Sequence, residues 1–276
     1  VPAGELTAEQ KNFILQRFFD ANWDHIIAVY PRYQELLDLR GGTDDTAIAA
    51  AVETYTEQDF RDPQIWFNLA WIDPDYLAQE PFKLLVDKGR DFTEEDKVVL
   101  FDGILELMQL VLSTHKELQD AGILEITTTP YAHPILPLIY DTDLALVGNP
   151  KATMPNRQFS EPEDAAFHLT KSVEMYESIF GREVRGLWPG EGSVAEEIVP
   201  LVSEAGYKWM QTGEPVLVAG LGLAGDRFNR NSDGVVNDPD TFYRPYYVQG
   251  ETGDQVAVFF RDWVISDKVG FTYSGM

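Results

Sequence analysis

The sequence contains no cysteine and only four histidines. Without cysteine the chain can form neither a disulfide nor a thiolate metal site, although this absence does not fix its compartment. It also has no excess of positive charge, because the formal net charge is −25 at pH 7. A chain of this charge repels phosphates, so nucleic acid and an anionic membrane surface are excluded as expected partners.

Long apolar runs, internal repeats and low-complexity segments are lacking as well. No apolar run approaches the ~20 residues that a membrane-spanning helix needs, so no membrane partner is expected. The chain starts at Val1 without an initiator Met and without a charged-then-apolar signal region. This favours a cytoplasmic location without fixing it. Because the sequence also stops at Met276 with no tail, we expect it to be truncated at both ends.

The composition supports a large buried core. Hydrophobic residues make up 44% of the chain, which includes 16 Phe, 12 Tyr and 6 Trp. Helical patterns cover residues 5–40 and 56–69, and the clearest helix is expected over 93–121, begun by Thr93 and Asp96 and ended by Gly122. Region 1–92 as a whole is predicted to be a helical insertion or layer, since no linker separates it as a domain.

From residue 93 onward, predicted helices and strands alternate. This order is typical of βα units and of a mainly parallel sheet, either open or closed into a barrel. Two capping boxes are expected to begin helices, Ser160 with Glu163 and Ser193 with Glu196. The second helix contains Pro200, which should kink it. The predicted strands are 123–129, 184–188, 207–212 and 255–260.

The most informative stretch is the sequence GLWPGEGS at residues 186–193. Here a buried strand breaks at Pro189, and Glu191 follows between two glycines that let the backbone approach something closely. An acid at the carboxyl end of a strand in an α/β protein points into the crevice where ligands bind. Alternatively, Glu191 is an acid near a helix N-terminus, which the helix dipole favours by itself. The residues alone leave both interpretations open.

Further polar residues collect at the strands. Glu125 lies within the first and His133 just beyond it, and the last two strands are followed by a second group: Thr212, Glu214, Arg261 and Asp262. In a barrel, strand ends share one mouth. Carboxylates at such a mouth can bind sugar hydroxyls, while aromatic rings such as Trp188 and Tyr131 can stack on the apolar faces of sugar rings. This combination suits sugar binding. Hydrolysis of a glycosidic bond itself requires two carboxyl groups that flank the bond.

Each of these residues also has an ordinary interpretation. His133 can be a loop histidine bonded to backbone, and no metal site is expected because the other histidines lie in helical patterns. Arg261 and Asp262 can form a surface pair of little energetic value. On their own patterns, Trp66 and Trp71 indicate helix packing more than sugar binding.

Four sequence windows, in order along the chain, resemble glycoside hydrolase family 57. The window around Glu191, LWPGEGSV, is similar to the region of that family's nucleophile. EITTTPYAHPILPL, which begins at Glu125, is similar to an earlier segment of the family. FNLAW at 67–71 and FRDWVISDKVGF at 260–271 are similar to two further segments. The resemblance covers essentially the whole chain.

The resemblance implies an α/β fold, an incomplete (β/α)7 barrel of the glycoside hydrolase and deacetylase type, as a single catalytic domain over 1–276. It also implies a retaining enzyme acting on α-glucans, as amylases, pullulanase-like enzymes, branching enzymes and glucanotransferases do, with no cofactor. By position, Glu191 matches the nucleophile, and Glu125 and His133 fall in the window that lines the glycone subsite. The other residues expected to bind substrate are Tyr131, Trp188, Asp262 and Trp71.

The sequence departs from the family pattern in two places. The family's opening His-Gln-Pro motif is missing, and the family's acid, an aspartate beyond the SDKVGF segment, lies outside this chain. Asp262 is the nearest substitute but does not match that position. We therefore expect an internal fragment with the nucleophile and little turnover. The alternatives are a non-catalytic carbohydrate-binding relative and, with less support, a metal-dependent deacetylase; the oligomeric state is not predicted.

Overall fold

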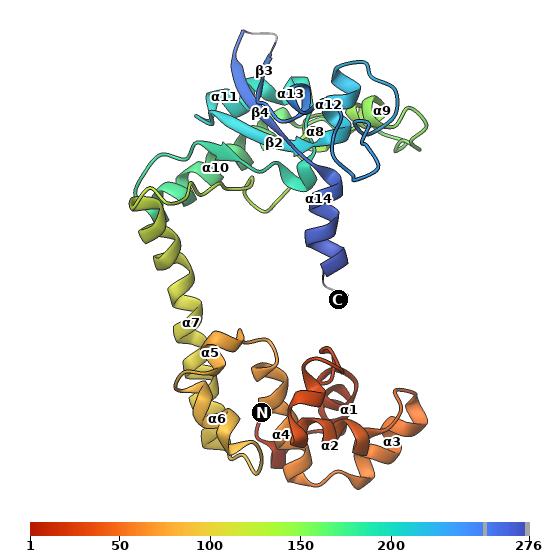
Figure 1. The fold of residues 1–276 in the computed structure, drawn as a ribbon, viewed down its shortest axis with the longest axis vertical. Helices are drawn as coiled ribbons and strands as arrows, with labels where there is room; N and C mark the ends of the chain where they lie inside the picture. The colour runs from red at the N-terminus through yellow and green to blue at the C-terminus, as the bar shows by residue number, and fades with distance from the viewer. Residues whose placement is uncertain (251–252, 274–276) are drawn as a thin grey trace. The chain divides into compact units, whose positions relative to one another are not determined.

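The computed structural model describes residues 1–250 and 253–273. The chain divides into two compact units, Val1–Ser113 and Thr114–Met276 (Figure 1). The first unit contains only helices among its described residues. Residues 1–92, predicted as a helical insertion or layer, lie within this unit, which continues beyond them into a long helix.

The helices of the first unit begin and end where local chemistry dictates. The hydroxyl of Thr56 accepts the N–H of Asp59 and the Asp59 carboxylate accepts the N–H of Thr56, so α4 begins with a capping box. α2 ends at Arg40, and Gly41, with φ 70°, is its C-cap. The helices are α1 (Ala8–Arg17), α2 (Pro31–Arg40), α3 (Asp45–Thr54), α4 (Glu57–Leu69), α5 (Pro74–Leu77), α6 (Phe82–Lys88) and the first part of α7 (Glu94–Asp120).

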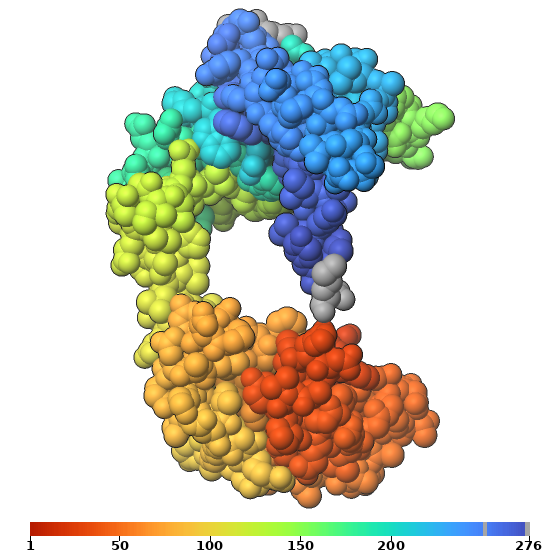
Figure 2. Space-filling view, in the orientation of Figure 1, coloured from red at the N-terminus to blue at the C-terminus, as the bar shows by residue number. Residues whose placement is uncertain are grey.

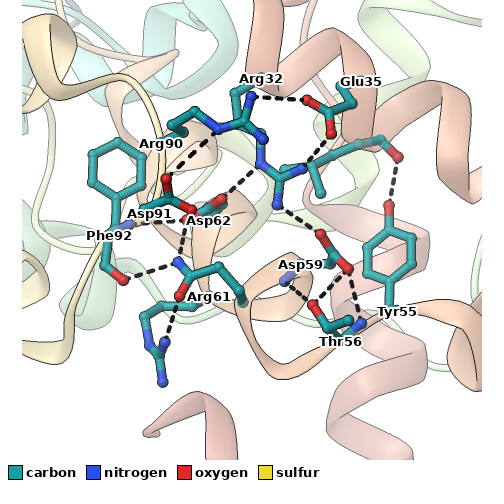
Figure 3. A network of polar contacts seen from close by, with 12 residues as sticks. Arg32, Glu35, Tyr55, Thr56, Asp59, Arg61, Asp62, Arg90, Asp91 and Phe92 are labelled. Atoms are coloured by element: carbon teal, nitrogen blue, oxygen red, sulfur yellow. Dashed lines mark hydrogen bonds and ion pairs between the residues drawn. The ribbon is translucent and has the colours of Figure 1, made fainter.

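A charged network connects α2 to α4 inside the first unit (Figure 3). Arg32 Nε donates to Asp62 Oδ2 at 2.7 Å, and Arg32 Nη2 donates to Asp59 Oδ1 at 2.6 Å. The third guanidinium nitrogen, Nη1, donates to Glu35 at 2.8 Å. Asp62 is fully buried. A buried carboxylate is tolerated only when it is paired, so this network fixes how the two helices pack.

Helix α7 is confirmed nearly residue for residue, and its first turn is the predicted pair of Thr93 and Asp96. By length and composition alone it could cross a membrane, with a mean hydropathy of 1.4 over its most apolar 18 residues. No such run was expected from the sequence, and Asp102 and Glu106 interrupt the apolar residues of this helix. One such helix is weak evidence for a membrane span.

The second unit is built on a four-stranded sheet in the order β1-β2-β4-β3. β1, β2 and β4 are parallel, as predicted, whereas β3 runs antiparallel to β4 and was not predicted. The predicted strand 123–129 is reduced to a single parallel bridge between Thr128 and Leu187. Among the described residues the sheet is open. Its strands are β1 (Gly186–Leu187), β2 (Trp209–Gly213), β3 (Tyr246–Gln249) and β4 (Gln255–Arg261).

Both helix starts predicted from serine capping boxes in this unit are wrong. The Ser160 hydroxyl bonds the carbonyl of Tyr140, and the following helix begins at a proline without a side-chain cap. Ser193 ends a short turn, and α11 begins six residues later. Pro200 lies in the first turn of α11, where proline suits a helix start instead of kinking it.

Helices cover one face of the sheet. α8, α10 and α11 pack against Leu187, Met210, Val256 and Val258, whose side chains all lie on the same face. The opposite face carries Trp209 and Phe259, and Phe259 remains 44% exposed. The α-helices of this unit are α8 (Leu136–Tyr140), α9 (Ala145–Gly148), α10 (Pro162–Phe180), α11 (Val199–Glu204), α12 (Glu214–Gly220), α13 (Pro239–Phe242) and α14 (Trp263–Asp267).

The chain between α12 and β3 was predicted as an excursion without clear period. It has its own small core, which contains Phe228, Val236 and Phe242 together with two residues of α12. Phe228 and Phe242 stack with their ring centroids 4.7 Å apart. In the space-filling view this segment forms a continuous part of the unit's surface, in light blue (Figure 2). It is thus an ordered cover at one end of the sheet.

Candidate active site

Glu191 lies at the centre of a tight turn directly beyond β1. The turn, Gly190–Gly192, is closed by hydrogen bonds from Gly192 N–H to the Pro189 carbonyl (2.8 Å) and from Ser193 N–H to the Gly190 carbonyl (3.0 Å). Glu191 has φ 56° and ψ 17°, a left-handed conformation that costs a non-glycine residue about 1–3 kcal/mol. No α-helix begins beside it, so the helix-dipole interpretation does not apply.

His133 faces Glu191 from the loop that follows Thr128. Its Nε2 lies 3.3 Å from Glu191 Oε1, and its Nδ1 lies 2.8 Å from the Thr129 hydroxyl. Because a carboxylate only accepts hydrogen bonds, Nε2 is the donor to Glu191, while Nδ1 lies within hydrogen-bond distance of the Thr129 hydroxyl. The three side chains therefore form a chain of hydrogen bonds that orients the carboxylate.

Left-handed backbone conformations also occur on the histidine side of this contact. Ala132 has φ 59° and His133 has φ 54°. Strained non-glycine residues cluster at functional sites, because the surrounding structure must hold them. Here they occur on both partners of one hydrogen bond. This coincidence makes the pair the strongest candidate for an active site among the described residues.

The two loops approach so closely that a side chain at Gly190 would force them apart. A Cβ on Gly190 would lie 2.2 Å from the carbonyl oxygen of Pro134, far inside van der Waals contact. Tyr131 anchors the histidine loop on α10: its N–H donates to the His168 carbonyl at 3.0 Å, and the two rings stack with centroids 6.3 Å apart. Tyr131 itself stays 43% exposed.

The uncovered face of the sheet carries further aromatic and polar side chains. The guanidinium of Arg261 lies over the Trp188 ring at 5.2 Å, and Trp209 meets Phe259 edge-on at 5.4 Å. Glu125 Oε1 accepts from Trp209 Nε1 at 2.8 Å. Since Trp209 is the first residue of β2, Glu125 lies at the amino ends of the strands and not at the carboxyl edge with Glu191. The prediction of one shared mouth does not hold for it.

Asp262 belongs to a separate polar cluster at the carboxyl ends of β2 and β4. Its Oδ2 accepts from the Tyr243 hydroxyl at 2.6 Å and its Oδ1 pairs with Arg230 Nη2 at 3.1 Å. Burial alone would raise the pKa of Asp262, but hydrogen bonds from Tyr243, the Ile265 N–H and Arg230 bring that pKa below its usual value. Burial and the Asp262 carboxylate raise the pKa of Tyr243 to about 12.

Glu214 completes this cluster and is fully buried. Both of its carboxylate oxygens pair with the Arg230 guanidinium, at 3.0 and 2.9 Å, and the Phe228 N–H donates to it at 2.7 Å. These contacts fix the excursion onto the sheet. Arg261 and Asp262, although adjacent in sequence, do not pair with each other: the partner of Asp262 is Arg230.

Trp71, the remaining predicted substrate-binding residue, lies in the first unit and is 67% exposed. Its ring meets Phe67 edge-on, with centroids 6.3 Å apart. The packing role expected from its pattern is therefore limited, for Trp71, to this contact with Phe67. For Trp66 it is confirmed, since that ring is 2% exposed and its Nε1 donates to the Gly89 carbonyl at 3.1 Å.

Sequence reasoning missed several residues of the site. Thr129 was treated only as part of a strand, and Trp209 only as the first part of another. The alternation of Trp209 with Gln211 on one face of β2 could have identified the uncovered face. Arg230 and Tyr243 carried no recognisable signal, because they come from the excursion. Within residues 1–250 and 253–273, no three His, Asp or Glu side chains lie together as a metal site would require.

The chain matches the model of glycosyl hydrolase family 57 over residues 46–276. It therefore belongs to this family, and the resemblance of the four sequence windows is confirmed. Among curated proteins, no sequence matches the chain.

Three solved structures illustrate the similarity. An α-amylase from Thermotoga maritima has 15% identity and a TM-score of 0.42 over 98% of this chain and 44% of its own. A family 57 branching enzyme from Thermococcus kodakaraensis has 16% identity and a TM-score of 0.43 over 99% and 47%. A 4-α-glucanotransferase from Thermococcus litoralis has 18% identity and a TM-score of 0.40 over 62% and 21%. The chain thus spans less than half the length of each of these structures.

Proposed function

We propose that this chain carries the nucleophile of a retaining glycoside hydrolase or transglycosylase that acts on α-glucans, and that Glu191 is this nucleophile. The observation that carries the proposal is the contact of its carboxylate with His133 Nε2 at 3.3 Å, between two strained loops. Membership of glycosyl hydrolase family 57 supports the reaction class. The assignment of α-glucans as the substrate class rests on this membership and is part of the proposal.

The reaction begins when a Glu191 oxygen attacks the anomeric carbon of the sugar. A carbon–oxygen bond forms to the carboxylate while the glycosidic bond breaks. The leaving oxygen keeps the electron pair of the broken bond and takes a proton from the general acid. Water or an acceptor hydroxyl then displaces the carboxylate. The His133 hydrogen bond keeps one carboxylate oxygen engaged, so that the other faces the sugar. Trp188 and Tyr131 provide aromatic surfaces for the apolar faces of sugar rings.

We infer that the general acid, which protonates the leaving oxygen, is a residue outside these 276 residues. Asp262 is unsuited to the role, because both of its oxygens are engaged and its lowered pKa keeps it ionised. A general acid has to hold a proton at the working pH. On this proposal the chain alone turns over natural α-glucans slowly, since general acid catalysis contributes about 10²–10⁴-fold to the rate.

A substrate whose leaving group needs no proton tests the nucleophile by itself. With α-maltosyl fluoride, Glu191 displaces fluoride, which departs with the electron pair, and a glycosyl ester forms on the carboxylate. Hydrolysis of the ester lacks its base, so the ester accumulates. We expect one maltosyl unit per chain by intact mass spectrometry, none in Glu191→Gln, and full labelling in the exposed control Glu197→Gln. Labelling that persists in Glu191→Gln contradicts the proposal.

The second candidate is a non-catalytic carbohydrate-binding protein. It is favoured by one observation, namely that the other two carboxylates at this edge, Glu214 and Asp262, are held by Arg230. A chain that binds maltooligosaccharide in calorimetry but is never labelled by maltosyl fluoride would support this candidate over the first.

A further inference from the structure

Thr212 is a buried threonine whose hydroxyl reaches the turn that carries Glu191. Its side chain is 1% exposed, and its Oγ1–H donates to the carbonyl of Gly192 at 2.6 Å. The two hydrogen bonds that close the turn use the carbonyls of Pro189 and Gly190. The bond from Thr212 is therefore additional to the turn, and it connects the turn to a neighbouring strand.

That strand is a rigid support. β2 lies between β1 and β4, and Thr212 is paired in register with Phe260 of β4. The turn, in contrast, contains two consecutive left-handed residues, Glu191 with φ 56° and Gly192 with φ 66°. Such a pair persists only where the surroundings fix it. The Gly192 carbonyl belongs to the peptide between Gly192 and Ser193, one residue beyond Glu191, so the bond from Thr212 restrains the end of the turn that carries the carboxylate.

We propose that Thr212 is a positioning residue for Glu191, acting through the Gly192 carbonyl to hold the nucleophile in its left-handed conformation. This inference rests on the proposed function of Glu191. Thr212 does not touch the sugar, because its side chain is buried on the helix-covered face of β2. Its loss should therefore change the rate of attack and leave the affinity for the sugar unchanged.

Thr212→Val removes the hydroxyl at nearly constant shape and leaves a buried carbonyl without its donor. We expect the first-order rate constant of labelling by α-maltosyl fluoride to fall roughly 10- to 100-fold, with the half-saturating concentration changed less than twofold. Thr212→Ser keeps the hydroxyl and should retain most of the rate. Thr127→Val is the matched control: Thr127 precedes the bridge to β1, and its hydroxyl makes no hydrogen bond among the described residues.

The rate and the amplitude of labelling separate positioning from misfolding. A variant that unfolds in part loses amplitude while its active fraction reacts at the original rate constant. The positioning role is overturned if Thr212→Val is labelled with a rate constant within twofold of the original. It is also overturned if only the extent of labelling falls.

Hydrogen exchange gives a readout that does not depend on activity. Thr212→Val should speed exchange at the amides of 190–193, and Thr212→Ser should not. Unchanged exchange in Thr212→Val overturns the inference, whereas an unlabelled parent chain with altered exchange in Thr212→Val overturns only the proposed function.

Discussion

At the scale of single residues, the site depends on backbone conformations that L-amino acids rarely adopt. Ala132, His133 and Glu191 all have φ between 54° and 59°. A sequence window of a few residues does not encode such values, because propensity alone disfavours them. They are held by contacts between loops that are 58 residues apart, as the bond from His133 to Glu191 shows. The cost of this strain is met by packing elsewhere in the unit.

Gly190 is the residue at which this packing can be tested most simply. A methyl group there meets the Pro134 carbonyl at 2.2 Å, so Gly190→Ala must separate the two loops. We expect a loss of about 1–3 kcal/mol in the free energy of unfolding and a slower labelling of Glu191. Urea unfolding followed by circular dichroism measures the first effect.

The control for this change is Gly220→Ala. Gly220 ends α12, and an added Cβ there has no atom within 4 Å. Its free energy of unfolding should stay within about 0.5 kcal/mol of the parent value. Equal stabilities for the two alanine variants would contradict the close approach of the loops.

At the scale of elements, the sequence predicted what local chemistry decides. The helix predicted over 56–69 is α4, and α7 begins at the predicted Thr93–Asp96 pair and ends just before Gly122, because such signals act within one turn. The capping boxes at Ser160 and Ser193 failed, since tertiary hydrogen bonds engage Ser160 and a left-handed turn precedes Ser193.

Strand content was predicted less well, for a similar reason. The segment 123–129 is rich in β-branched residues, but a strand must pair with a neighbouring strand along its length. Only Thr128 of this segment forms a bridge to another strand. β3 went unpredicted because its residues Tyr246–Gln249 follow an irregular excursion. Of the candidate site, Glu191, His133, Trp188 and Tyr131 were predicted from sequence windows and remain predictions, whereas Thr129 and Trp209 were not predicted, because they join it through contacts between distant segments.

The cluster of Arg230 with Glu214 makes a prediction at this scale. Arg230→Met leaves the fully buried Glu214 carboxylate without its cation, and breaking such a pair costs about 3–5 kcal/mol of stability. The double variant Arg230→Met with Glu214→Leu removes both charges and should recover most of that loss. Denaturant midpoints measure both values, and a single variant as stable as the parent would show that the cluster does not hold the excursion.

At the scale of the whole molecule, the dominant property is the net charge of −25 at pH 7. Like charges repel within the folded chain, and salt screens this repulsion over a Debye length of about 10 Å at 0.1 M. We expect the melting temperature at pH 7 to rise between 0.05 and about 0.5 M NaCl.

The same titration near pH 4.3, the pI given by the sequence, provides the control. There the net charge vanishes, so salt should have little effect on the melting temperature. A melting temperature at pH 7 that stays constant or falls with added salt would contradict a destabilising self-repulsion.

Family membership applies to most of the chain, since the match spans residues 46–276 and so includes part of the helical unit as well as the sheet. The central claim, however, concerns one carboxylate. Peptide mapping by tandem mass spectrometry after reaction with α-maltosyl fluoride tests it most directly. The account predicts the maltosyl ester on Glu191, in the peptide that contains residues 186–193. A maltosyl group found on any other residue, or no labelled peptide at all, would contradict it.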